Sequence, residues 1–365
     1  MIGSPRLLGA RPAAPPYSLS GAGGTAPAPD RPATRARLRA WAELLRVSAL
    51  VTVPGDALAG AAAAGRRPGR GTALAVGASL CLYEAGMALN DWADREEDAV
   101  DRPHRPIPSG RVTPGAALAA AAVLTGAGLA LASRAGRPAL AVASGLAATV
   151  WAYDLRLKHT QLGPAAMATA RTLDLMLGAT ATVATMSAQP GRGGAASPTR
   201  SATAPAPSAA PTRSATAPAP SAPSAALPAA LALGAHTYAV TAVSRHEVQG
   251  GSTAAPMAAL AGVAGIGAAF LRVRPGTGEP HRAPAVRLLL PAFTAAYLHT
   301  SAVPLLHAAL NPSPPLTQRA VGGGIRAMIP LQAALTARAG APVDGLAVMG
   351  LVPLARALAR KVSAT

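Results

Sequence analysis

The chain has 365 residues, of which 50% are hydrophobic, 13% charged and 3% aromatic, and its formal net charge is +18. A soluble domain usually carries about a quarter charged residues, so this composition excludes an ordinary soluble domain and favours close-packed membrane helices. The single cysteine, Cys81, excludes a disulfide framework.

The basic residues are scattered between apolar runs. A nucleic-acid-binding chain would instead cluster them on one face with interleaved aromatic residues, so we predict no nucleic-acid partner. Anionic lipid headgroups and a diphosphate are the expected partners of this positive charge.

Residues 1–40 are rich in proline, alanine and arginine and lack apolar periodicity, which predicts a disordered tail. From 41 to 365, apolar stretches alternate with proline, glycine and charge clusters and predict one all-α transmembrane domain. Each stretch is near the length that a bilayer requires. About nine spans are expected, at 44–64, 71–91, 113–133, 138–157, 163–187, 226–244, 256–273, 285–307 and 328–355.

Segment 189–225 interrupts this pattern, between the fifth and sixth spans. The sequence PTRSATAPAPSA at 198–209 recurs at 211–222 and lacks the apolar content to pack. Such a composition is extended and flexible, so we predict a loop insertion on the side of the membrane opposite the loops after the second, fourth and sixth spans. A glycosylated or partner-binding stalk is the alternative.

The run 90–109 reads NDWADREEDAVDRPHRPIPS and follows directly on an apolar stretch. On a helix Asn90, Asp94 and Asp98 repeat every four residues and Asp91 lies three before Asp94, so one face presents an amide and three carboxylates. Mg²⁺ prefers oxygen ligands and tends to combine one or two carboxylates with phosphate oxygens of a substrate. The run therefore predicts a diphosphate site. The alternative is a solvated acidic helix end whose carboxylates pair with Arg95, Arg102 and Arg105.

NDxxDxxxD followed by DRPxRPIPSGR resembles the first aspartate-rich motif of the UbiA superfamily of intramembrane prenyltransferases. The resemblance implies a helical bundle around a central cavity, in which Mg²⁺ and a prenyl diphosphate bind. It implies a metal-binding role for Asn90, Asp91, Asp94 and Asp98. It also implies that Asn90 and Arg105 bind substrate and that Arg102 neutralises phosphate charge.

If this motif ends the second span, the loops after the fourth and sixth spans lie on the same side of the membrane. The loop after the fourth span contains YDLRLK at 153–158, where the resemblance places a tyrosine and a downstream lysine. Lys158 is suited to neutralising a diphosphate leaving group, with Tyr153 as its catalytic neighbour. The alternative is an ordinary positive anchor at a helix end.

The loop after the sixth span reads SRHEVQGG at 244–251 and offers one carboxylate, Glu247. Most UbiA-type enzymes carry a second DxxxD motif here. The pattern SRxEVxGG resembles a variant in a UbiA-like subgroup that includes the EboC-type proteins. Glu247 is expected to be a metal ligand, with Arg245 taking over phosphate charge. Weakened or lost transferase chemistry is the alternative.

The fifth span contains Arg171 and Asp174, three residues apart and therefore on one face. An intramembrane ionisable pair is expensive and usually functional. The resemblance implies that Arg171 is catalytic and that Asp174 binds substrate. A buried ion pair that fixes helix packing is the alternative. Asp56, in the first span, either faces the cavity or bonds to backbone groups freed at Pro54.

By resemblance, the predicted function is Mg²⁺-dependent transfer of a prenyl group from a prenyl diphosphate to an aromatic or other lipophilic acceptor within the membrane. The expected setting is a bacterial cell membrane, with membrane lipids as partners and the active site facing the cytoplasm. The missing second aspartate motif motivates the alternative, a non-catalytic lipid- or isoprenoid-binding or transport protein on the same scaffold. The sequence leaves the oligomeric state open.

Overall fold

The computed structural model describes residues 31–187, 223–272, 284–354 and 357. Every regular element within these residues is a helix, so the all-α prediction is confirmed. The α-helices are α1 (Arg31–Leu44), α2 (Val53–Ala63), α3 (Arg70–Ala93), α4 (Arg95–Asp101), α5 (Pro114–Ala135), α6 (Arg137–Ala152), α7 (Gly163–Ser187), α8 (Leu227–Ser244), α9 (Ala254–Leu271), α10 (Pro284–Leu310), α11 (Pro314–Arg338) and α12 (Pro342–Met349). Shorter elements are the 3₁₀ helices η1 (Val47–Thr52) and η3 (Ser224–Ala226) and the π-helix η2 (Tyr153–Leu157).

Five helical segments are long and apolar enough to cross a membrane: α3, α5, η3 with α8, α9 and α10. The helices α7 and α11 have 25 residues each, which corresponds to about 37 Å of helix, but both carry charged side chains. Five of the about nine expected spans are therefore long and apolar enough to cross a membrane, and α7 and α11 are long enough.

Two predicted spans have wrong boundaries. The first, 44–64, is interrupted, because η1 precedes an α2 of only 11 residues. The last, 328–355, is divided between two helices: α11 ends at Arg338 and α12 begins at Pro342. Gly340 has φ 91° between them, a conformation that ends a helix, and proline is favoured in the first turn of the next one.

The disordered tail was predicted to cover residues 1–40. This prediction is wrong for residues 31–40, because they form most of α1. Ala40 and Leu44 are buried there in one hydrophobic cluster with Leu89 and Ile107. This burial places α1 against the end of α3. Residues 1–30 and most of the predicted insertion, 188–222, lie outside the described residues.

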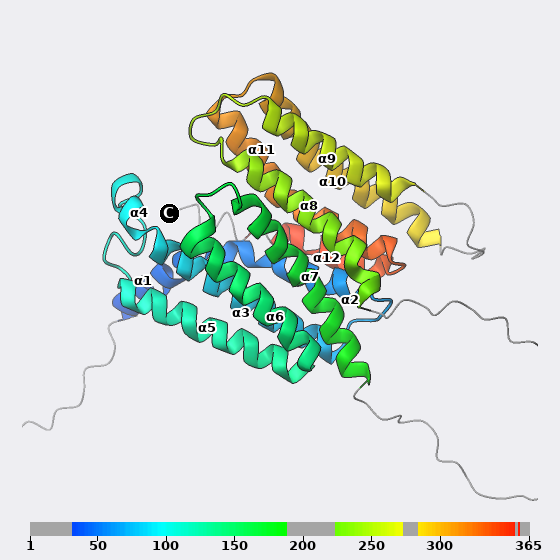
Figure 1. Ribbon diagram of the computed structural model, residues 1–365, viewed down its shortest axis with the longest axis horizontal. Coiled ribbons are helices and arrows are strands. Elements are labelled where there is room, and N and C mark those ends of the chain that lie inside the picture. Colours follow the sequence, from blue (N-terminus) through cyan, green and yellow to red (C-terminus); the bar gives the residue numbers. More distant parts are fainter. Residues whose placement is uncertain (1–30, 188–222, 273–283, 355–356, 358–365) are drawn as a thin grey trace, which may run out of the picture.

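The helix α2 lies inside the bundle and contacts α3, α7 and α11. In Figure 1, α3, α5 and α6 form one side of the molecule and α8 to α11 the other, with α2, α7 and α12 between them. A methyl group on Gly60 would lie 2.2 Å from the carbonyl oxygen of Leu175, and one on Gly178 would lie 2.5 Å from the Cα atom of Ala57. Glycine at both positions therefore permits α2 and α7 to approach closely, as in other membrane bundles.

Candidate active site

The acidic run lies where α3 passes into α4. Asn90 and Asp91 occupy the last turn of α3, Asp94 joins the two helices, and Asp98 is in α4. The predicted single helix is interrupted at Asp94, whose ψ of 5° departs from helical values. The four-residue hydrogen bonds nevertheless continue, from Asp94 N to Asn90 O (2.9 Å) and from Asp98 N to Asp94 O (2.8 Å). The predicted spacing is thus largely retained.

Asp91 and Asp98 share one guanidinium partner. Arg105 Nη1 lies 2.6 Å from Asp98 Oδ2 and 3.4 Å from Asp91 Oδ1. Both aspartates are almost completely buried, with 5% and 1% of their surface exposed. Arg102 adds a contact to Asp98 at 3.3 Å, and Arg46 one to Asp91 at 3.1 Å. Two buried carboxylates of the run are therefore paired with three arginines, of which Arg46 and Arg102 are partly exposed.

Arg46 was missed by the sequence analysis. Its backbone has φ 48° and ψ 47°, the left-handed conformation, which no other non-glycine residue adopts within the described part of the chain. Such strain often occurs at functional sites. Arg46 lies near the start of the first predicted span, 44–64, and an arginine at the end of a span carries little signal.

Asp94 contacts a different part of the chain. Its carboxylate forms an ion pair with Lys158, and His159 Nε2 lies 3.8 Å from Asp94 Oδ1. The π-helix η2 directly precedes these two residues, and Lys158 N donates across it to Tyr153 O at 2.9 Å. Single π-turns are frequent at functional sites. The predicted proximity of the 153–158 loop to the aspartate run is therefore what the structure shows.

A group of possible ligand atoms surrounds Asp94. Asp94, Glu97 and His159 each offer one such atom, and these atoms lie within 4.8 Å of one another. Two carboxylates fit the Mg²⁺ preference for oxygen, and the remaining positions suit substrate phosphate oxygens and water. Glu97 and His159 were not predicted, although Glu97 lies three residues after Asp94 and therefore on the same helix face.

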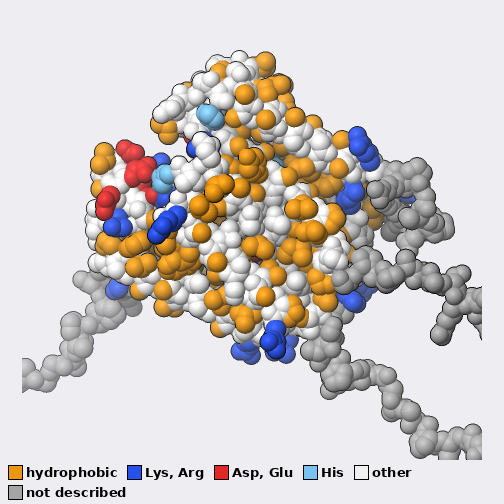
Figure 2. Space-filling view, in the orientation of Figure 1, with side chains coloured by type: hydrophobic (Ala, Val, Ile, Leu, Met, Phe, Trp, Pro, Cys, Tyr) orange, Lys and Arg blue, Asp and Glu red, His pale blue; other side chains and the backbone are white. Residues whose placement is uncertain are grey.

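The loop after α8 approaches the aspartate run. Glu247 is half-buried there, which raises its pKa, while the positive charge of Arg102 opposes this rise. Arg245 donates to the carbonyl oxygen of Thr160, so this side chain joins the loop after α8 to the loop after η2. The three loops predicted to share one side of the membrane are thus near one another. Figure 2 shows the acidic side chains gathered at this end, beside lysine and arginine.

A model of the UbiA prenyltransferase family matches residues 50–310. The chain belongs to the UbiA prenyltransferase family. It is 38% identical over 130 residues to the digeranylgeranylglyceryl phosphate synthase of Methanopyrus kandleri, which covers 34% of this chain and 46% of that protein. With the synthase of the same name from Ignicoccus hospitalis it shares 35% identity over 147 residues, 40% of this chain and 48% of that protein. The chain spans about half or less of the length of the curated relatives it matches.

Solved UbiA-type structures have the same fold. A structure reported for digeranylgeranylglyceryl phosphate synthase superposes with a TM-score of 0.53 at 14% identity, covering 83% of this chain and 98% of that one. A UbiA homologue from Archaeoglobus fulgidus bound to GPP and Mg²⁺ gives 0.52 at 17% identity, covering 85% and 99%. The fold and the apolar helices together identify an integral membrane protein.

A second polar cluster lies deeper in the UbiA bundle. Arg171 forms an ion pair with Asp56 and lies 3.9 Å from Asp174, which accepts a hydrogen bond from Ser79. Gln332 Nε2 donates to Asp56 Oδ1 at 2.7 Å and to the carbonyl oxygen of Thr52 at 2.7 Å. These residues come from four helices and η1: α2, α3, α7 and α11.

This deeper cluster is separate from the aspartate run. Ser79 precedes Asp91 by twelve residues on α3, or about 18 Å along the helix axis. The structure therefore does not bring Arg171 and Asp174 together with Asp91 and Asp94. Arg171 forms an interhelical ion pair, a contact that agrees with both readings left open by the sequence. Ser79 and Gln332 were missed, since single polar residues within apolar runs carry little signal.

Proposed function

We propose that this protein transfers a prenyl group from a prenyl diphosphate to an aromatic or other lipophilic acceptor, with Mg²⁺ as cofactor. The observation that carries the proposal is the convergence of Asp91, Asp94 and Asp98 with four cationic side chains at one end of an apolar bundle. Carboxylates hold a divalent cation, and lysine and arginine accept a diphosphate, so this arrangement supplies both.

Asp94 is the proposed central metal ligand, with Asn90, Asp91, Asp98 and Glu247 as the other proposed ligands. Bound Mg²⁺ would supply positive charge to the diphosphate oxygens. Asp91 and Asp98 are held in place by Arg105, so their orientation is fixed before any ligand enters. Metal binding at Asp94 would release Lys158 from its ion pair and make its ammonium available to the diphosphate.

The reaction breaks the bond between the allylic carbon and the diphosphate oxygen, and the electron pair leaves with the diphosphate. Lys158, Arg102 and Arg245 are proposed to stabilise this growing negative charge. The allylic carbon then bonds to a nucleophilic atom of the acceptor, which gives up a proton. Apolar helix walls keep water from the carbocation. Tyr153, half-buried beside Asp94, is proposed to face the reacting carbon.

Arg171 and Asp174 lie deeper in the bundle than the aspartate run. We propose that they line the inner part of the substrate cavity, where Asp56 holds Arg171 in place. Because the similar proteins are digeranylgeranylglyceryl phosphate synthases, a glyceryl phosphate lipid is an acceptor to be tested beside aromatic ones. A bacterial cell membrane and a site that faces the cytoplasm remain part of the proposal.

A second candidate function is isoprenoid binding or transport without catalysis. The loop after α8 favours this function, because Glu247 is its one carboxylate between Arg245 and Gly250, where a second DxxxD motif would offer two. Labelled prenyl diphosphates of several chain lengths, incubated with Mg²⁺ and a panel of acceptors, discriminate the two. The enzyme converts label to a prenylated product and releases diphosphate. Binding of the label without product from any acceptor would favour the carrier.

A further inference from the structure

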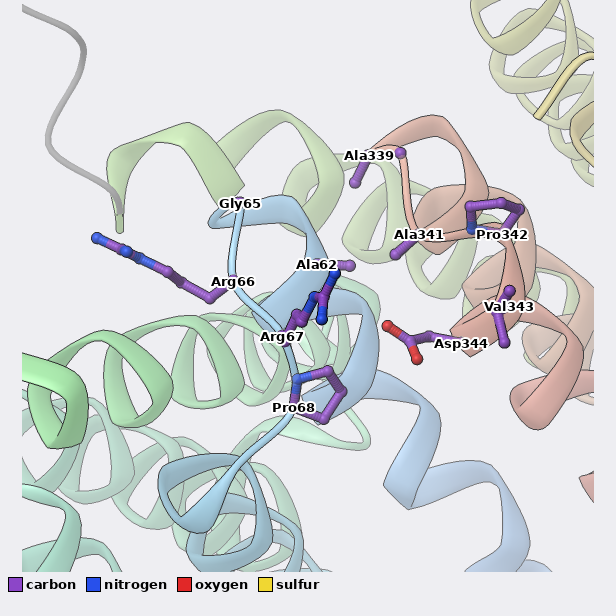
Figure 3. Close-up of a pocket in the computed structure, with 11 residues that line it drawn as sticks. Ala62, Gly65, Arg66, Arg67, Pro68, Ala339, Ala341, Pro342, Val343 and Asp344 are labelled. Atoms are coloured by element: carbon purple, nitrogen blue, oxygen red, sulfur yellow. The ribbon is translucent and has the colours of Figure 1, made fainter. Parts of the chain in front are cut away.

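A pocket of about 650 Å³ lies at the end of the bundle opposite the aspartate run (Figure 3). Its walls are the loop between α2 and α3 and the turn between α11 and α12. The helix α3 begins beside this pocket and ends at the aspartate run, and its 24 residues correspond to about 36 Å. Because that length crosses a bilayer, the pocket lies at the other membrane surface.

Two opposite charges face this pocket. Figure 3 shows the side chains of Arg67 and Asp344 reaching into it from opposite walls, whereas Arg66 points away. Among the described residues, neither Arg67 nor Asp344 takes part in a salt bridge. The pocket therefore offers one cationic and one anionic group to a ligand that carries both charges.

One helix N-terminus adds positive potential. The helix α12 starts at Pro342, and its first residues, Pro342 to Asp344, line the pocket. The free N–H groups and the dipole at a helix N-terminus favour a phosphate. Arg67 on the opposite wall would add a charge-assisted hydrogen bond.

An apolar surface continues from the pocket along α12. Val343 and Leu346 are three residues apart on this helix, and 71% and 48% of their surface is exposed. They therefore lie on one face of α12. Val343 also lines the pocket, so a ligand with a charged head and an apolar tail could contact both.

We propose that this pocket binds the headgroup of an aminophospholipid, of the phosphatidylethanolamine type. The phosphate lies against Arg67 and the N-terminus of α12, the ammonium group lies against Asp344, and an acyl chain covers Val343 and Leu346. A purely anionic headgroup would place negative charge against Asp344. A quaternary ammonium headgroup would lack N–H donors for this carboxylate.

The test uses full-length protein, purified, stripped of lipid and kept free of Mg²⁺ and prenyl diphosphates. Phosphatidylethanolamine, phosphatidylglycerol and phosphatidylcholine are added separately, and bound lipid is measured by native mass spectrometry. Wild type should bind phosphatidylethanolamine most tightly. Arg67→Gln should weaken this binding at least about tenfold, as expected for a lost hydrogen bond to a charged group. Arg134→Gln, an exposed arginine in the last turn of α5 near the same membrane surface, serves as the matched control.

Asp344→Asn distinguishes the contribution of Asp344 to lipid binding from that of Arg67. This variant should lose the preference for phosphatidylethanolamine over phosphatidylglycerol while it retains phosphate binding. Equal binding of the three lipids to wild type, or wild-type binding by Arg67→Gln, would overturn the proposal. Free glycerophosphoethanolamine is a further arm. If it competes as strongly as the intact lipid, the ligand is a soluble phosphate compound and the membrane-lipid assignment is wrong. None of these measurements depends on prenyl transfer.

Discussion

At the scale of single residues, the aspartates of the run differ in their surroundings. Asp91 and Asp98 are buried and paired with arginines that also position them, whereas Asp94 pairs with Lys158 and lies beside Glu97 and His159. A metal ion can enter at Asp94 without removing an arginine from a buried carboxylate. Asp94 is therefore where we expect substitution to affect metal binding most directly, and asparagine keeps an oxygen atom that can accept a hydrogen bond from Lys158.

Asp94→Asn is predicted to weaken Mg²⁺-dependent binding of prenyl diphosphate at least about tenfold, because the amide lacks the negative charge that the metal requires. Binding of labelled prenyl diphosphate, with and without EDTA, measures this. Glu96→Gln is the matched control, since the Glu96 side chain is 87% exposed and pairs with Arg95. Wild-type, EDTA-sensitive binding by Asp94→Asn would refute the metal site.

Glu247→Gln decides whether the loop after α8 takes part in catalysis. The substitution removes one negative charge and keeps the size and hydrogen-bonding ability of the side chain. Turnover should fall by about 10²–10³, the cost of losing an electrostatic stabiliser, while diphosphate binding through the first motif falls much less. Steady-state rates and equilibrium binding are both needed. A Gln variant with wild-type turnover would show that Glu247 has no catalytic role.

Much of this site could be predicted from residue order. The four-residue spacing of Asn90, Asp94 and Asp98 survives the interruption at Asp94, because backbone hydrogen bonds of the same spacing continue through it. Arg46 could not be predicted, since its contact with Asp91 joins residues 45 positions apart. The same holds for Gln332, whose contact with Asp56 spans 276 positions. Contacts of this kind depend on the packing of the whole bundle.

At the scale of helices, the close approach of α2 and α7 is the feature that sets the position of the deeper polar cluster. Asp56 lies on α2 and Arg171 on α7, so a shift between these helices would separate the pair. Gly60 is the point of contact, because a methyl group there would meet the backbone of α7.

Gly60→Ala is therefore predicted to destabilise the protein by about 1–3 kcal/mol, the usual cost of overpacking. Gly126→Ala is the matched control: this glycine lies within α5, and a methyl group there would meet no atom within 4 Å. The control should be neutral or slightly stabilising, since alanine has the higher helix propensity. Thermal unfolding in detergent provides the comparison. Equal melting temperatures for the two variants would contradict the packing described for α2 and α7.

Helix boundaries show where sequence patterns are insufficient. The apolar run before the acidic motif predicted α3 closely, at 71–91 against Arg70–Ala93. The span predicted at 328–355 was wrong, because apolar content continues across Gly340 while the backbone turns there. Hydropathy depends on composition alone, so it does not detect a residue with positive φ, such as Gly340, inside an apolar stretch.

At the scale of the whole molecule, one membrane surface carries the aspartate run with the loops after α6 and α8, and the other carries the Arg67 pocket. Most of the insertion predicted at 189–225 precedes η3 and lies outside the described residues. Deletion of residues 195–223 is expected to leave membrane insertion and prenyl transfer nearly unchanged, because a long loop, as its composition predicts, adds little closure entropy per residue. Membrane fractionation and product formation test this expectation. Loss of the deleted protein from the membrane fraction would contradict it.

Release of diphosphate by the purified protein shows whether the aspartate run supports metal-dependent prenyl transfer. With a prenyl diphosphate and an acceptor, we expect release that requires Mg²⁺, stops with EDTA and is lost in Asp94→Asn but retained in Glu96→Gln. Binding of prenyl diphosphate without release of diphosphate, for every acceptor and chain length in the panel, would contradict the claim and identify a carrier.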